Sequence, residues 1–116
     1  MHDGIYIAGP MSGIADLNHP AFMDAEKFLR SMGYKNIGNP AAWDKQSGVE
    51  RADGDVTAML ADGFDLRGTF HKDLTYLCRE AGAIYMLHGW EGSSGARAEH
   101  AVARMLRLNF IYQDAH

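Results

Sequence analysis

Short apolar runs alternate along the chain with longer segments in which apolar residues recur every three or four positions. The short runs are bounded by glycine or polar residues and predict buried strands, whereas the longer segments have the period of amphipathic helices. The predicted strands are residues 4–8, 34–38, 83–87 and 109–112. This alternation predicts a parallel sheet of four to five strands with helices on both faces, an α/β fold of the flavodoxin or Rossmann type.

Three helices are predicted between these strands. The first begins near Asn18 and ends at Gly33, the second is capped by Thr69, and the third begins near Ser93. Their apolar faces are expected to be Phe22, Ala25, Leu29 and Met32, then Phe70, Leu74, Leu77 and Cys78, and finally Ala98, Ala101, Val102 and Met105. Cys78 should therefore be a buried thiol. Residues 41–68 show no clear pattern beyond a short helix at 56–61, and a loop this long is usually functional or mobile.

Composition limits the classes of protein that fit. A chain of 116 residues with 47% hydrophobic and 22% charged residues suits one folded domain. The net charge of -4 and the absence of a basic stripe argue against a nucleic-acid partner. A single cysteine excludes an intrachain disulfide. The start resembles no signal peptide and no apolar run approaches the roughly 18 residues of a membrane span. We therefore expect a cytoplasmic protein without membrane contact.

Three segments follow predicted strands and should meet at one edge of the sheet: residues 9–13, 39–44 and 88–95. Ligands of parallel α/β sheets bind at this edge. Residues 9–13 match neither a P-loop nor a dinucleotide fingerprint, so they are either a plain turn or a loop that a ligand can approach. Ser93 begins a helix, whose electropositive end suits an anion such as phosphate.

Two carboxylates complete this candidate site. Glu99 lies in the first turns of the third helix, where the helix dipole alone could also explain an acidic residue. Asp73 lies on the flank of the second helix and could equally be a solvated surface carboxylate. Trp43 and Trp90 are candidates to stack on a base or to pack a loop against the sheet. The histidines lack paired metal-ligand spacing, so no metal or cofactor is expected, and His71 and His100 should lie at the surface.

Together these segments resemble a known pattern. It comprises residues 5–13, Asn39-Pro40, Asp73-Leu74 and residues 89–99, which include Ser93, Gly95 and Glu99. The pattern is that of short, often phage-encoded members of the nucleoside 2-deoxyribosyltransferase-like superfamily. The resemblance covers nearly all of the chain, least well at residues 45–68, and implies a single domain over residues 1–116. The superfamily includes deoxyribosyltransferases and deoxynucleoside 5′-monophosphate N-hydrolases.

By resemblance, Glu99 is the nucleophile that attacks the anomeric carbon, Asp73 assists the leaving base, and Tyr6 orients the glutamate. The carboxylates fit an oxocarbenium-like transition state. The substrate-binding residues that the resemblance implies are Gly9, Pro10, Met11, Ser12, Gly13, Asn39, Trp90, Ser93 and Gly95.

The resemblance also implies a nucleoside or nucleotide as the partner, a homo-oligomer, and the host cytoplasm if the protein is phage-encoded. Two departures leave alternatives open. Gly82 stands where relatives commonly carry an aspartate, and the first loop lacks an arginine that some phosphate-binding members have. Hydrolysis and transfer both remain open, as do a nucleotide-binding protein without turnover and a small assembly module.

Overall fold

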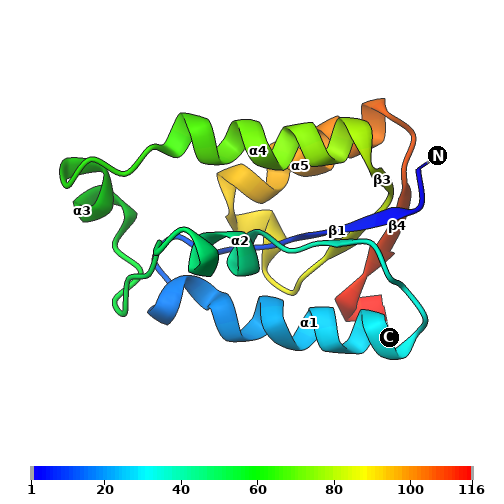
Figure 1. The fold of residues 1–116 in the computed structure, drawn as a ribbon, viewed down its shortest axis with the longest axis horizontal. Coiled ribbons are helices and arrows are strands. Elements are labelled where there is room, and N and C mark those ends of the chain that lie inside the picture. The colour runs from blue at the N-terminus through cyan, green and yellow to red at the C-terminus, as the bar shows by residue number, and fades with distance from the viewer. Residues whose placement is uncertain (1, 116) are drawn as a thin grey trace.

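The sheet has four parallel strands, as the sequence predicts. The computed structural model describes residues 2–115. In it, β1 (Gly4–Ala8) pairs with β3 (Ala81–Met86), β2 (Ile37–Gly38) lies outside β1, and β4 (Asn109–Tyr112) lies outside β3 (Figure 1). All three neighbouring pairs are parallel. This order confirms the predicted α/β architecture of the flavodoxin or Rossmann type.

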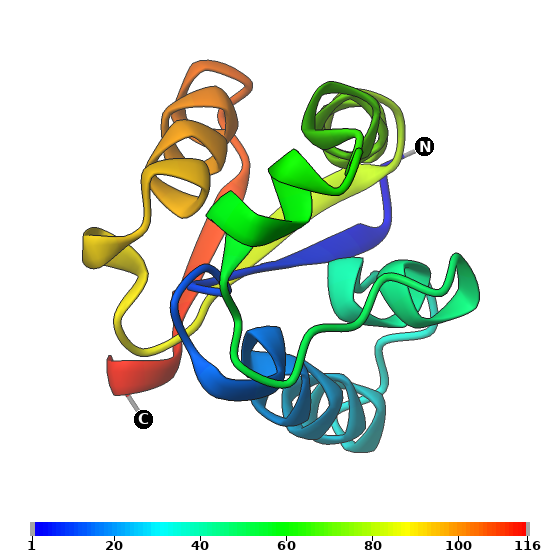
Figure 2. The same ribbon diagram turned by 90° about the vertical axis from the view of Figure 1, so that its left-hand side faces the viewer.

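Helices cover both faces of the sheet because successive side chains of a strand point to opposite sides. On one side Ile5 of β1 packs in a buried cluster with residues of α1 (His19–Ser31). On the other side Tyr6 packs in a second cluster with residues of α4 (Leu66–Arg79) and α5 (Ser94–Met105). Figure 2 shows the resulting layers, with the sheet between α1 and the pair α4 and α5.

The segment between β2 and α4, which sequence patterns left largely unassigned, contains two short helices. The helix α3 (Val56–Ala61) was expected, whereas α2 (Pro40–Gln46) was not. Asn39 caps α2, because its Oδ1 accepts hydrogen bonds from the backbone N–H groups of Ala41 and Ala42 at 3.0 and 3.4 Å. The remaining short elements are 3-10 helices: η1 (Ala15–Asn18), η2 (Trp90–Gly92) and η3 (Gln113–Ala115).

Several boundaries differ from the sequence-based expectations. The second strand is reduced to its last two residues, Ile37–Gly38. The helix α4 begins before Thr69, because Asp65 caps it by accepting a hydrogen bond from the Gly68 N–H at 2.9 Å. Cys78 is exposed rather than buried. The helix turns by about 100° per residue, and its buried stripe contains Asp73 and Leu77, so the position after Leu77 faces outward.

The predicted apolar face of α5 was right only in part, since Val102 packs against the second cluster but is not fully buried. The buried residues of this helix are Ala96, Glu99 and Ala103, which are three and four positions apart. Met105, expected in the core, is 84% exposed. A count of apolar residues could not find this face because its central member is a carboxylate. The inward position of Glu99 makes its carboxylate part of the interior.

The helices of residues 2–115 are too short or too polar to traverse a lipid bilayer.

Candidate active site

A cavity of about 660 Å³ opens beside the segments that follow the two central strands. Residues 9–12 follow β1 and line one part of it, and residues 92–96 follow β3 and line another. The strand order reverses direction between β1 and β3, so this is the topological switch point at which ligands of such sheets bind. The predicted edge of the sheet therefore carries a cavity large enough for a small organic ligand.

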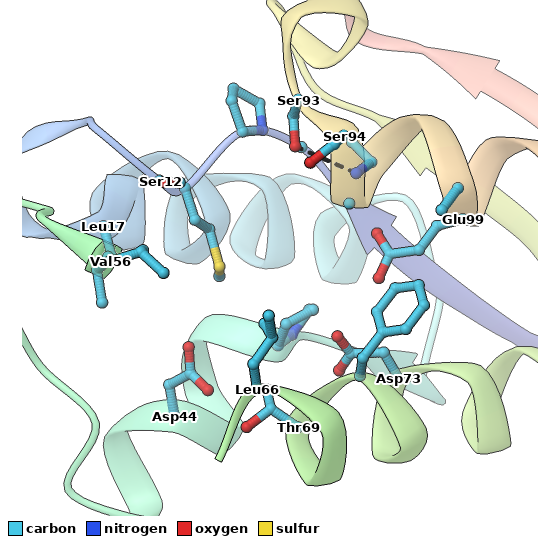
Figure 3. A pocket seen from close by; sticks show the side chains of 18 of the residues that line it. Ser12, Leu17, Asp44, Val56, Leu66, Thr69, Asp73, Ser93, Ser94 and Glu99 are labelled. Carbon is cyan, nitrogen blue, oxygen red and sulfur yellow. Dashed lines mark hydrogen bonds between the residues drawn. The ribbon is translucent and has the colours of Figure 1, made fainter. Parts of the chain in front are cut away.

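The three residues predicted to be catalytic come together in this cavity. The Tyr6 hydroxyl donates a hydrogen bond to Glu99 Oε2 at 2.6 Å. Glu99 is 6% exposed and Asp73 is 8% exposed, so Asp73 is not the solvated surface carboxylate that the sequence also allowed. Figure 3 shows the carboxylate of Glu99, from α5, and that of Asp73, from α4, directed into the same part of the cavity.

The electrostatics of this cluster favour protons on its carboxylates. Burial, followed by the nearby charge of Asp44, raises the pKa of Asp73 to about 7. Burial, followed by the charge of Asp73, raises the pKa of Glu99 to about 8, although the Tyr6 hydroxyl bond opposes that rise. Burial and the two carboxylates also raise the pKa of Tyr6 well above its ordinary value, so Tyr6 remains a hydrogen-bond donor.

The two carboxylates titrate as one interacting pair, which carries a single proton within the neutral pH range. Tyr6 donates its hydrogen bond to the charged form of Glu99, and such a bond favours that form. The Tyr6 hydroxyl also lowers the pKa of Asp73, and the pKa of Glu99 remains the higher of the two, so Glu99 and Asp73 share the single proton of the pair. One acid and one base then stand side by side in a site that is largely shielded from water.

The N-terminus of α5 forms another part of the cavity wall. Ser93, within the turn of residues 92–95 that suits an N-cap, caps this helix, because its Oγ accepts a hydrogen bond from the Ala96 N–H at 3.1 Å. Ser93, Ser94 and Gly95 all line the cavity. The first N–H groups of a helix lack partners within it and carry partial positive charge. This end of the cavity therefore suits an anionic group.

The first loop lies only partly at the cavity. Gly9, Pro10, Met11 and Ser12 line it, whereas Gly13 does not. Gly9 also has a packing requirement, since a Cβ there would lie 2.7 Å from the Leu87 side chain. The sequence therefore placed four of the five residues of this segment correctly with respect to the cavity, while their role in binding stays a prediction.

Asn39, predicted to bind substrate, does not line the cavity. It is 1% exposed, and its Nδ2 donates a hydrogen bond to Glu26 Oε1 at 3.0 Å while its Oδ1 caps α2. The side chain thus joins α1 to the start of α2. Its position after β2 is as expected, but its polar atoms are engaged within the fold.

The two tryptophans take part in packing rather than in the cavity wall. Trp90 stacks on His100 with ring centroids 4.4 Å apart and lies beside Tyr112. Trp43 packs against Tyr6 and Tyr76, at centroid distances of 6.3 and 5.6 Å. The sequence left open whether the tryptophans stack on a base or pack within the protein. These contacts agree with packing for both residues. His100 is consequently half-buried, whereas His71 is exposed as expected.

Sequence reasoning missed a third carboxylate in the cavity. Asp44, on α2, is 8% exposed and lines the cavity, and its Oδ2 lies 3.6 Å from Nε2 of the fully buried His19. The sequence signal that could have identified Asp44 is its position soon after β2, which places it at the edge of the sheet where the other cavity residues lie. Arg67, in the first turn of α4, also lines the cavity and supplies a cation that the first loop lacks.

The segment between α2 and α4 forms an apolar wall that no sequence pattern indicated. Backbone hydrogen bonds attach it to the first loop and η1: Gly13 N–H donates to the Gly54 carbonyl and Asp16 N–H donates to the Ala52 carbonyl, both at 2.8 Å. A Cβ on Gly54 would overlap the backbone carbonyl group of Ile14. The side chains that this segment and the start of α4 present to the cavity are Val49, Val56, Met59, Phe64 and Leu66.

The departure at Gly82 lies outside the cavity. Gly82 is near the start of β3, and a Cβ there would collide with the backbone carbonyl of His2. Glycine at this position therefore has a packing reason, and the described carboxylates of the cavity do not depend on it. Within residues 2–115 no group of three His, Cys, Asp or Glu side chains is arranged to hold a metal ion.

The fold and this site define a small α/β domain with a buried carboxylate pair at the switch point of its sheet. The model of one protein family, described as "Domain of unknown function (DUF4406)", matches residues 3–112, and the chain belongs to this family. No curated protein and no solved structure matches the chain. The family match does not connect the chain with the nucleoside 2-deoxyribosyltransferase-like superfamily, so that resemblance stays a prediction.

Proposed function

We propose that this protein cleaves the N-glycosidic bond of 2′-deoxynucleosides or their 5′-monophosphates. The observation that carries the proposal is the buried hydrogen bond from Tyr6 to Glu99, next to Asp73 in a cavity that a helix N-terminus also lines. This reaction requires a nucleophile and a proton donor, and a 5′-monophosphate would in addition use an anion site.

In the first step the pair reacts with its proton on Asp73, and an oxygen of ionised Glu99 attacks the anomeric carbon of the deoxyribose. Tyr6 already binds Oε2, so Oε1 is the oxygen for attack. The bond between the anomeric carbon and the base breaks, and its electron pair goes to the base nitrogen, which takes the proton from Asp73. The transition state resembles an oxocarbenium ion, which the negative charge of Glu99 stabilises.

In the second step the bond between the sugar and Glu99 breaks. Asp73, now ionised, removes a proton from water or from an acceptor base. The oxygen of the water or the nitrogen of the acceptor base then bonds to the anomeric carbon. Glu99 leaves as a carboxylate and Asp73 holds a proton again, so both groups return to their starting states. Water gives hydrolysis, and an acceptor base gives transfer.

The charges of the cavity favour one position for a 5′-phosphate. Phosphate near the carboxylates would be repelled, whereas the start of α5 offers unpaired N–H groups and the hydroxyl of Ser94. Binding the phosphate there would hold the sugar near Glu99, one turn along the same helix. Contacts remote from the reacting carbon would thus contribute to positioning it.

The proposal is tested by chromatography for free base. The wild type and Glu99→Gln would be incubated with a panel of deoxynucleosides and their 5′-monophosphates, with and without an acceptor base. We expect base release by the wild type and a loss of about 10³-fold or more in Glu99→Gln. Glu91→Gln, an exposed acidic position outside the cavity, is the matched control and should keep full activity.

Two results would contradict this function. Equal base release by wild type and Glu99→Gln would exclude Glu99 as the nucleophile. Tight nucleotide binding in calorimetry with no product after long incubation would identify a binding protein without turnover. The expected homo-oligomer stays a prediction too, which light scattering would check.

A further inference from the structure

The mechanism above leaves one buried carboxylate of the cavity without a role. Asp44 reaches the cavity from α2, and Figure 3 shows its side chain across the cavity from Ser93 and Ser94. Apolar residues such as Leu66 and Val56 stand near it in the wall. A carboxylate in such a wall costs folding free energy unless it has a partner.

The partners of Asp44 lie behind it, inside the protein. His19 Nε2 is 3.6 Å from Asp44 Oδ2, and both ring nitrogens of His19 are buried without a hydrogen bond to any described residue. Burial raises the pKa of Asp44, while the charges of His19 and Lys72 act in the opposite direction. The charge of Asp44 in turn raises the pKa of Asp73. His19 and Lys72 thus oppose the effect of burial without outweighing it, and the side of the carboxylate away from His19 faces the cavity.

The order of groups in the cavity suggests what Asp44 faces. If phosphate binds at Ser93 and the sugar lies at Glu99, the leaving base extends past Asp73 toward the wall that contains Asp44. An ionised carboxylate only accepts hydrogen bonds. It would therefore complement an N–H group on the edge of the base that is remote from the sugar.

We infer that Asp44 is a specificity-determining residue, which accepts a hydrogen bond from an amino or imino N–H of the substrate base. The substrate class is then deoxynucleotides whose base carries such a donor on its remote edge. This inference rests on the proposed function, because it assumes a base in the cavity. The inference adds a preference among bases, which Asp73 and Glu99 alone do not impose.

The test uses two matched pairs of substrates that differ in this donor. One is 2′-deoxyadenosine 5′-monophosphate and its analogue without the 6-amino group, which removes atoms and so cannot clash. The other is thymidine 5′-monophosphate and its N3-methyl derivative. We expect the wild type to prefer the donor-bearing member of at least one pair by about tenfold or more in kcat/KM. If nucleotides bind without base release, the same ratios are measured as calorimetric affinities.

In Asp44→Asn the ratio should fall to within about threefold, because the amide is uncharged and can donate as well as accept. Asp62→Asn, at an exposed position outside the cavity, is the control and should keep the wild-type ratio. A folded Asp44→Asn with an unchanged ratio overturns the inference. If Asp44→Asn fails to fold, the substrate ratios of the wild type test the inference instead. Wild-type ratios within about threefold for both substrate pairs would overturn the inference.

These outcomes separate the two proposals. Base release without discrimination within either pair overturns only the role of Asp44. Neither base release nor nucleotide binding by the wild type overturns the proposed function and, with it, this inference.

Discussion

The two sides of the cavity are built in different ways. The side formed by β1, α4 and α5 carries Tyr6, Asp73 and Glu99, which are buried within the second core cluster or beside it. The opposite side, from α2 to the start of α4, is mainly apolar and is attached through backbone hydrogen bonds that include those at Gly54. The first side depends on the core, whereas the second depends on a loop.

Under the proposed function, this difference predicts that the core side carries the chemistry and the loop side recognises the substrate. Chemistry needs groups held within a few tenths of an ångström, and side chains on packed helices and strands provide that precision. Recognition of a substrate tolerates more variation, and loops commonly provide it. Changes to the buried carboxylates on the core side should therefore alter kcat, whereas changes on the loop side should alter KM.

The largest expected effect is on stability and concerns the core side. The pKa of Asp73 rises from 3.8 to about 7 and that of Glu99 from 4.5 to about 8. Both groups bind protons more tightly in the folded protein than in the unfolded chain. Their contribution to stability is thus complete below about pH 4 and is lost as the pH rises through 7 to 8.

Urea unfolding at pH 5 and pH 9 measures this loss. We expect the free energy of unfolding to fall by roughly 3 kcal/mol or more, at about 1.4 kcal/mol per pKa unit. Glu99→Gln should show a smaller decrease, because its neutral amide does not ionise and leaves Asp73 beside an uncharged group. A free energy of unfolding that is constant or rises over this range would contradict the raised pKa values of the pair.

The next effect concerns catalysis on the same side. Tyr6→Phe removes the hydroxyl that donates to Glu99, so ionised Glu99 loses stabilisation and its pKa should rise further. We expect kcat to fall about 100-fold, as for the loss of one well-placed donor, and the acidic limb of the pH profile to move to higher pH. Tyr76→Phe, which removes a hydroxyl bound to Asn36 outside the cavity, is the control and should leave that limb unchanged.

A smaller effect is expected from the loop side. Gly54 has φ +67°, and a Cβ there would overlap the carbonyl group of Ile14. Gly54→Ala should reduce the free energy of unfolding by about 2 kcal/mol and raise KM several-fold with kcat nearly unchanged. Gly48→Ala, at φ +74° with open space around its Cβ, separates backbone strain from the collision and should cost about 1 kcal/mol. A large loss of kcat in Gly54→Ala would disprove the division between the two sides.

The smallest effect is expected at the helix N-terminus. Ser93→Ala removes the cap of α5 and should cost about 1 kcal/mol in thermal or chemical unfolding. It should also weaken binding of a deoxynucleoside 5′-monophosphate more than binding of the deoxynucleoside, by about fivefold in calorimetry. Ser47→Ala, at an exposed position beyond α2, is the control. Equal weakening of both ligands would place the phosphate elsewhere.

The sequence was informative where structure is local. Residues that end a strand or begin a helix carry short-range signals, and these signals predicted the sheet, a helix cap within residues 92–95 and the position of Glu99. The helix α2 was missed because its seven residues are too few to show a clear period. Cys78 was misplaced because a shift of one position around a helix changes core into surface.

Contacts between distant residues explain the remaining differences at the site. Asn39 follows a strand, as a ligand-binding residue would, but Glu26 on another helix engages its amide. Trp90 lies next to the site in sequence, yet it stacks on His100. Asp44 lies 3.6 Å from His19, which is 25 positions earlier in the sequence. Such pairs form only when helices pack, so no local pattern reveals them.

The attachment of residues 52–54 also has an evolutionary consequence. The two hydrogen bonds there join backbone groups, so they place few demands on the side chains of the segment apart from glycine at position 54. Val49 and Val56 line the cavity and their side chains take no part in these two bonds, so we expect exchanges there to disturb the attachment little. Descendants of one ancestral sequence could thus acquire different ligand preferences through a few substitutions in this segment, while inheriting the same buried carboxylate pair.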